Sequence, residues 1–267
     1  MQTVRIDQTD LDVSRLGFGT ASLHHLPLVR GRRSLLEAAL DAGITHFDTS
    51  PYYGYGLAEK DLGRFMRGRR SAVTVATKVG LYPPGPTPFG AAGVWARKAL
   101  GRVVRSLAAP REDWTVAAAE RSLHQSLKRL GTDYLDILFL HEPPRPESVA
   151  ADDFLAWFEA QRAGGVIRAW GVSGESRSYS AWLNAGHRIV QVVQARDSLD
   201  GREADAVTAA GRPLQLTYGY LGAAMRADAS VCARDVLRRA LERNRTGAVI
   251  ISTRRAERVA DLAEAAA

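Results

Sequence analysis

Residues 44–54 read Ile44-Thr45-His46-Phe47-Asp48-Thr49-Ser50-Pro51-Tyr52-Tyr53-Gly54, a short apolar segment with an expected alternation of side chains between two faces, which stops at an aspartate and a turn. The alternation places Ile44, His46 and Asp48 on one side of an expected strand that ends at Asp48. In parallel α/β folds, ligands bind at the carboxyl ends of the strands, so this segment predicts the edge of an active site. Taken alone, it fits equally well an aspartate that caps the next helix and two surface tyrosines.

Strand and helix patterns alternate along the chain on both sides of this segment. The expected strands are residues 15–19, 44–48, 72–77, 134–140, 167–172, 189–193, 214–217 and 248–251. Each is followed by a helical pattern, and a β-hairpin over residues 4–6 and 11–13 precedes the first. Eight such units match a (β/α)8 TIM barrel. A doubly wound sheet is the alternative, but Gly17-Phe18-Gly19-Thr20-Ala21-Ser22 lacks its GxGxxG spacing.

Residues 79–113 interrupt the alternation. They are rich in Gly and Pro at first and in Arg and Ala later, and they exceed an ordinary βα loop of about 2 to 6 residues. We interpret them as a βα-loop insertion that forms a lid or pocket wall. Because no linker breaks the remaining pattern, we expect one barrel domain over residues 1–267.

The net charge of +7 permits binding to nucleic acid, but its distribution argues against that partner. Basic residues are spread over many helices and form no patch interleaved with aromatic side chains. Only four of the 36 basic residues are lysines, which indicates a coding bias toward arginine more than a selected charge. We therefore expect no nucleic-acid partner.

Cys232 is the single cysteine. An intramolecular disulfide and a cysteine-based metal cluster are both excluded, and we expect no metal site. The first residues lack the apolar segment of a signal peptide, and no run reaches the roughly 18 apolar residues of a membrane span. The expectation is a soluble cytoplasmic protein with no membrane partner.

Four polar residues are expected to meet at one rim of the barrel. Asp48, Lys78 and His141 end the second, third and fourth predicted strands, and Tyr53 lies five residues past Asp48. A phenol with a pKa near 10 is a weak proton donor at neutral pH, and a cation within about 4 to 6 Å lowers such a pKa by roughly 1 to 3 units. Lys78 would supply that cation, Asp48 would hold it, and His141 would orient a substrate oxygen.

Several segments resemble signature blocks of the aldo-keto reductase family: residues 17–20 (GFGT), 42–54 (AGITHFDTSPYYG), 76–78 (ATK) and 126–141 (SLKRLGTDYLDILFLH). The resemblance extends over roughly residues 10–260 apart from the insertion. It implies an NAD(P)H-dependent carbonyl reductase on a (β/α)8 barrel, in which hydride passes from nicotinamide C4 to a carbonyl carbon. The family's general acid is the tyrosine before the glycine, here Tyr53. Tyr52 and Tyr55 are expected to line the pocket or to pack.

The resemblance also implies a set of cofactor contacts. Ser173 matches the serine of the family's Gly-Val-Ser-Asn block, and Gln194 matches the glutamine that holds the carboxamide. Tyr218 matches the aromatic residue that stacks under nicotinamide. The adenosine phosphate is assigned to Ser252, Thr253, Arg254 and Arg258. Arg254 and Arg258, expected one helical turn apart, favour a 2′-phosphate, so we expect NADPH, with NADH possible.

Three departures from the family pattern qualify this expectation. Gly174 stands where the family usually has an asparagine that contacts the carboxamide, and Leu262 stands where it often has an asparagine that contacts adenine. The helix pattern reaches the last residue, so a C-terminal loop that closes the pocket is expected to be absent. We then expect an open pocket for bulky substrates, walled by His24, His25 and residues 79–113.

Three functions remain open at this point. The first is reversible, NADPH-dependent reduction of a small-molecule aldehyde or ketone, with Tyr53 as general acid. The second is a catalytically weak or inactive NADP-binding barrel with a regulatory or subunit role. The third is isomerisation or elimination without a nucleotide cofactor. Substrate identity, direction and oligomeric state are not indicated by the sequence.

Overall fold

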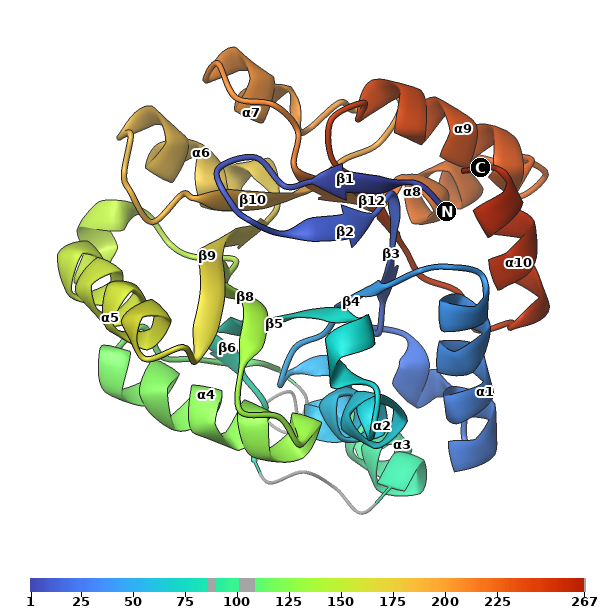
Figure 1. The fold of residues 1–267 in the computed structure, drawn as a ribbon, viewed down its shortest axis with the longest axis horizontal. Helices are drawn as coiled ribbons and strands as arrows, with labels where there is room; N and C mark the ends of the chain where they lie inside the picture. Colours follow the sequence, from blue (N-terminus) through green and yellow to red (C-terminus); the bar gives the residue numbers. More distant parts are fainter. Residues whose placement is uncertain (86–89, 101–108, 267) are drawn as a thin grey trace.

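Eight parallel strands close into a barrel surrounded by helices (Figure 1). The computed structural model describes residues 1–85, 90–100 and 109–266. In barrel order, the strands are β3 (Leu16–Gly19), β4 (His46–Asp48), β5 (Thr74–Val79), β8 (Leu135–His141), β9 (Ile167–Gly174), β10 (Val192–Arg196), β11 (Leu216–Tyr218) and β12 (Ala248–Ile251). The predicted (β/α)8 TIM barrel is confirmed.

The predicted hairpin is also confirmed and lies across one end of the barrel (Figure 1). Strands β1 (Thr3–Arg5) and β2 (Asp12–Ser14) pair in antiparallel register. Ile6, Leu11 and Val13 are fully buried and pack with side chains of the barrel interior, such as Phe139. The hairpin therefore seals the barrel with apolar side chains at the end opposite the carboxyl ends of the strands.

The α-helices lie outside the strands. They are α1 (Val29–Asp41), α2 (Leu57–Met66), α3 (Gly90–Leu100), α4 (Val116–Leu130), α5 (Ala151–Ala163), α6 (Ser176–Asn184), α7 (Asp205–Ala209), α8 (Tyr220–Ala227), α9 (Ala233–Arg243) and α10 (Glu257–Glu264). Short 3-10 turns are η1 (Leu23–His25), η2 (Tyr53–Gly56), η3 (Arg70–Ala72) and η5 (Pro146–Ser148). Helix α8 is absent from the expectation, because residues 220–227 are too short and glycine-containing to show a clear period.

Two strand ends differ from the expectation in a way that matters for the site. Lys78 lies inside β5, because the ladder with β8 continues through the pairing of Lys78 with Phe139. Gln194 lies inside β10, because the ladder with β11 continues to the pairing of Arg196 with Tyr218. Inter-strand hydrogen bonding thus extends both strands beyond the apolar run.

The described residues of the predicted insertion form three elements. Strand β6 (Leu81–Tyr82) pairs with β7 (Arg111–Glu112), and α3 packs against the segment after Tyr53. In that contact, Ala91 and Val94 cluster with Tyr55 and Leu57. Residues 86–89 and 101–108 of the predicted lid lie outside the described residues. The assignment of one domain with a loop insertion stays a prediction.

A buried histidine lies on the inner side of β4. His46 is fully buried, and its Nδ1 lies 2.9 Å from the Thr74 hydroxyl. Its Nε2 has no hydrogen-bond partner within the described residues. Burial lowers the pKa of His46 to about 4, so the native protein holds this ring neutral near neutral pH.

We expect His46 to make the protein acid-sensitive. In the unfolded chain, the imidazole takes up a proton near pH 6.5, whereas the folded chain resists it down to about pH 4. Stability present above pH 6.5 is therefore lost as pH falls toward 4, by about 3 kcal/mol. In urea unfolding, His46→Gln should flatten this pH dependence by that amount. The exposed control His124→Gln should leave it unchanged, and an unaltered slope in His46→Gln would contradict the assignment.

Candidate active site

Asp48, Lys78 and Tyr53 meet at the carboxyl ends of β4 and β5. The Lys78 ammonium donates to Asp48 Oδ1 at 2.6 Å and to the Thr49 carbonyl at 2.9 Å, and it lies 3.3 Å from the Tyr53 hydroxyl. Lys78 is only 1% exposed. Because Asp48 and the carbonyl fix the ammonium, its charge is held beside the phenol oxygen.

His141 joins this group from the end of β8. Its ring meets the Tyr53 ring edge to face, with centroids 6.0 Å apart, and its Nδ1 lies 3.4 Å from the Ser50 hydroxyl. The structure thus places all four of the predicted rim residues together.

The turn that carries Tyr53 depends on Gly54. Gly54 has φ of 59°, and a Cβ there would come within 2.7 Å of the Cβ of His24. Tyr55 also has a positive φ, of 56°, and its ring is buried against α3. Glycine is therefore required both for the backbone conformation and for the close contact with η1.

The expected acidification of Tyr53 by Lys78 is wrong for the protein as it stands. Burial, together with the charges of Asp48 and Glu142, holds the pKa of Tyr53 well above its usual value. Burial also lowers the pKa of Lys78, although Asp48 opposes this change. Because burial and the two carboxylates both raise this pKa, Tyr53 is a phenol that stays protonated at neutral pH.

Burial also lowers the pKa of His141 well below its ordinary value, and the Lys78 charge adds to the effect. His141 is therefore a neutral imidazole at neutral pH. A neutral ring can donate a hydrogen bond to a substrate oxygen without itself transferring a proton.

Ser173, Gln194 and Tyr218 lie on successive strands beside this group. The Ser173 hydroxyl donates to Gln194 Oε1, and Gln194 Nε2 donates to Asp48 Oδ1 at 2.8 Å. Tyr218 ends β11, where it pairs with Arg196. A continuous set of polar contacts therefore connects Lys78 to the strand ends on the far side of the barrel.

A cavity of about 410 Å³ opens at these strand ends. Its inner wall includes Asp48, Tyr53, Gln194 and Tyr218, and it extends to Ser252 after β12. Lys78, His141 and Ser173 support this wall without lining it. The cavity thus combines a phenol, an amide and an aromatic ring in a concave site suited to a small organic ligand.

The predicted phosphate-binding residues are less closely associated with the cavity. Arg254 and Arg258 are exposed, and neither Thr253 nor these arginines line it. Arg254 precedes α10, so the expected spacing of one helical turn is wrong. Leu262 is 3% exposed and packs in the core between barrel and helices, where an asparagine would lose apolar burial.

The expected walls of the pocket also need correction. Neither His24, His25 nor any described residue of 79–113 lines this cavity. Instead, the edge of the Trp95 ring meets His25, with ring centroids 6.1 Å apart. The described part of the insertion therefore packs against the turn that carries Tyr53 and does not line the cavity.

The wall on the outer side comes from helix α8, which the sequence did not indicate. Tyr220, Leu221, Gly222 and Arg226 line the cavity there. Gly219, between Tyr218 and Tyr220, was the available signal, because it adopts φ of 109° where the chain turns from β11 into α8.

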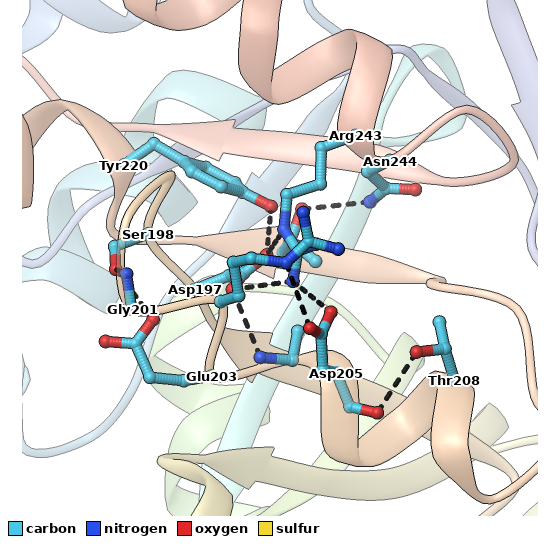
Figure 2. A network of polar contacts seen from close by, with 12 residues as sticks. Asp197, Ser198, Gly201, Glu203, Asp205, Thr208, Tyr220, Arg243 and Asn244 are labelled. Atoms are coloured by element: carbon cyan, nitrogen blue, oxygen red, sulfur yellow. Dashed lines mark hydrogen bonds and ion pairs between the residues drawn. The ribbon is translucent and has the colours of Figure 1, made fainter.

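A buried polar network anchors this wall (Figure 2). Asp197 accepts the Tyr220 hydroxyl at 2.5 Å and the Nε of Arg243 at 2.5 Å. Arg243 also binds Asp205 at 2.8 Å, and the Ala204 amide donates to Asp197 at 3.1 Å. Asp197 is 1% exposed, and its charge is thus compensated from α8, α9 and the start of α7.

Comparison with known proteins gives consistent matches. The model of the Aldo/keto reductase family matches residues 15–199. The chain is 34% identical over 177 residues to D-threo-aldose 1-dehydrogenase of a Pseudomonas species, covering 61% of this chain and 50% of that protein. It is 30% identical over 222 residues to pyridoxal 4-dehydrogenase of Microbacterium luteolum, covering 78% and 61%. The aligned part therefore spans about half to three fifths of these curated relatives.

A solved structure shares the fold. An aldo-keto reductase from Klebsiella pneumoniae in complex with NADPH superposes with a TM-score of 0.69 at 22% identity, covering 99% of this chain and 89% of that one.

Within residues 1–85, 90–100 and 109–266, none of the helices has the length and apolar content needed to cross a membrane.

Proposed function

Because this chain belongs to the aldo/keto reductase family, we propose that it transfers hydride between NADP(H) and a small-molecule carbonyl or alcohol, with Tyr53 as the proton-transfer residue. One observation carries the proposal: the Tyr53 ring lines the cavity while the Lys78 ammonium, paired with Asp48, lies 3.3 Å from its hydroxyl. This is the arrangement that delivers a proton to an oxygen bound in the cavity.

The cavity suits a dinucleotide by its shape and lining. It extends from Tyr53 and Gln194 at the barrel centre to α8 and Ser252 at the rim, and Gly19, Gly219 and Gly222 leave room along its wall. Ser173, Gln194 and Tyr218 would hold the nicotinamide end. Ser252, Thr253, Arg254 and Arg258 would hold the adenosine phosphate, the arginines through exposed side chains able to turn toward a 2′-phosphate. The bound cofactor would supply or accept hydride at nicotinamide C4.

The roles of the protein side chains in reduction follow from their protonation states. Tyr53, kept protonated by its raised pKa, donates its proton to the oxygen of the carbonyl as negative charge develops there. Lys78 stabilises the phenolate that remains, and Asp48 keeps the ammonium in position. Neutral His141 hydrogen-bonds the same oxygen and aligns it beside the phenol. In alcohol oxidation, these steps run in reverse.

The substrate class is a small polar aldehyde, ketone or corresponding alcohol. Two relatives are named as acting on an aldose and on pyridoxal, and both compounds carry an aldehyde or its hemiacetal beside hydroxyl groups. The cavity volume of about 410 Å³ admits molecules of this size with the nicotinamide.

The test is cofactor binding followed by turnover. Quenching of tryptophan fluorescence should give tighter binding for NADPH than for NADH, and consumption of NADPH should follow addition of an aldehyde from a panel that includes aldoses and pyridoxal. Binding without turnover across the panel would favour a regulatory NADP-binding barrel instead. If the protein binds no nicotinamide cofactor, cofactor-independent proton transfer is the hypothesis that remains.

A further inference from the structure

Three carboxylates lie near the inner end of the cavity, and they differ in how their charge is compensated. Asp48 pairs with Lys78 at 2.6 Å, and Glu175 pairs with Arg196 and Arg177. Within the described part of the chain, Glu142 has no ion-pair partner. Its charge is thus offset at longer range by the Lys78 ammonium, which is already paired with Asp48.

The structure holds Glu142 firmly at this place. Its amide donates to the Ser173 carbonyl at 2.7 Å, and its φ of 52° turns the side chain back over the end of β9. Its Oε2 accepts the Glu175 amide at 3.1 Å and the Ser178 hydroxyl. A backbone conformation that is costly for glutamate is therefore maintained by several contacts.

Gly174 provides the space for this carboxylate. A Cβ at residue 174 would come 2.5 Å from Glu142 Oε2 and 3.1 Å from Oε1. Any larger residue would displace the carboxylate from the strand end. The glycine and the glutamate are thus sterically coupled, and Glu142 occupies space that a side chain at residue 174 would need.

The charge of Glu142 is felt inside the cavity even though Glu142 does not line it. It raises the pKa of both Tyr53 and Tyr218, and these two rings form the inner wall. Its oxygen Oε1 has no hydrogen-bond partner within the described residues. The negative potential at the inner wall is therefore only partly offset.

We infer that Glu142 makes this site favour the oxidised, positively charged nicotinamide over the neutral reduced one. The inference rests on the proposed function. In that reaction, hydride with its electron pair leaves the cofactor for the carbonyl carbon, and the proton of Tyr53 goes to the carbonyl oxygen. The carbonyl is reduced and NADPH is oxidised, so the positive charge appears only on the product side. A nearby carboxylate lowers the free energy of the bound, positively charged nicotinamide and leaves that of the neutral reduced one nearly unchanged.

During reduction the same charge acts on the proton donor in the opposite direction, because it disfavours the Tyr53 phenolate that forms as the proton leaves. By disfavouring the Tyr53 phenolate, it keeps the phenol protonated before the reaction. Glu142 acts through its charge and touches neither the substrate nor the reacting atoms. Its effect should therefore be visible in the binding equilibria of the cofactor, without turnover.

The experiment compares dissociation constants of NADP⁺ and NADPH, measured by tryptophan fluorescence or calorimetry at neutral pH. Glu142→Gln keeps the shape and the acceptor oxygen but removes the charge. We expect it to weaken NADP⁺ binding by about fivefold and to leave NADPH binding nearly unchanged. The matched control Glu203→Gln removes a carboxylate that binds Ser198 outside the cavity and should leave the ratio unaltered.

The possible outcomes separate the two proposals. If the wild-type protein binds neither cofactor, the proposed function fails and the role of Glu142 fails with it. If the wild type binds both and Glu142→Gln leaves the ratio unchanged, only the role of Glu142 is overturned. Should Glu142→Gln not fold, Gly174→Ala, whose Cβ would displace the carboxylate from the strand end, must lower the NADP⁺ preference by a smaller amount, and an unchanged ratio would equally overturn the inference.

Discussion

We expect Tyr53→Phe to lower the rate of hydride transfer by about 10² to 10⁴-fold. NADPH binding should stay within about twofold of the wild type, a difference of less than about 0.5 kcal/mol. The substitution removes the hydroxyl that lies 3.3 Å from Lys78, while the ring remains against His141. Because the proton donor is lost and the pocket shape is kept, the loss should fall on kcat. Single-turnover reduction of an aldehyde and fluorescence titration of NADPH measure the two effects separately.

Tyr52→Phe is the matched control for this prediction. Tyr52 precedes Tyr53 in the chain, but its ring packs edge to face against Tyr55 at 6.2 Å, and it does not line the cavity. We expect turnover close to that of the wild type. An equal loss in Tyr52→Phe, or wild-type turnover in Tyr53→Phe, would assign the proton transfer to another group.

Lys78→Met is expected to reduce both activity and stability. The ammonium is buried, and its removal leaves the Asp48 carboxylate, which is 5% exposed, without its cation. Breaking one half of a buried ion pair costs about 3 to 5 kcal/mol of unfolding free energy. The rate of hydride transfer should also fall by about 10²-fold or more, because the phenolate loses its stabilising charge.

The double variant Asp48→Asn/Lys78→Met separates these two effects. With both charges removed, no uncompensated charge remains, so most of the lost unfolding free energy should return. The rate should stay low, because the ammonium beside Tyr53 is still missing. Urea unfolding and single-turnover rates on the three variants provide the comparison. Recovery of the rate together with the stability would mean that the ion pair serves the fold and not the chemistry.

The agreement between sequence and structure is best where a local pattern and a packing requirement coincide. Residues 135–140 are apolar except for Asp136 and are buried in β8, as a parallel strand covered on both sides requires. Asp48 and His141 are the last residues of β4 and β8, as expected from where the apolar pattern stops. Proximity of these residues followed from the barrel topology alone.

The protonation state of Tyr53 could not be predicted from such sequence patterns. The lysine beside Tyr53 was expected to lower the pKa of the phenol, and its position is as expected. The pKa is nevertheless raised, because it also depends on burial and on Glu142, a residue 89 positions away in the sequence that shows no pattern of its own. A pKa that depends on burial and on several charges can be derived only when the positions of all the surrounding atoms are known.

The sequence alone determined the (β/α)8 barrel and the position of Asp48, Tyr53, Lys78 and His141 at one rim. The strand period, the polar strand ends and the order of the strands along the chain can all be recognised from local sequence. The tertiary structure alone decided that α8 forms the outer wall of the cavity, that Arg254 and Arg258 stand outside it, and that Glu142 fills the space over Gly174. These features arise where segments distant in sequence pack together, and their sterics and fields exist only once the chain has folded.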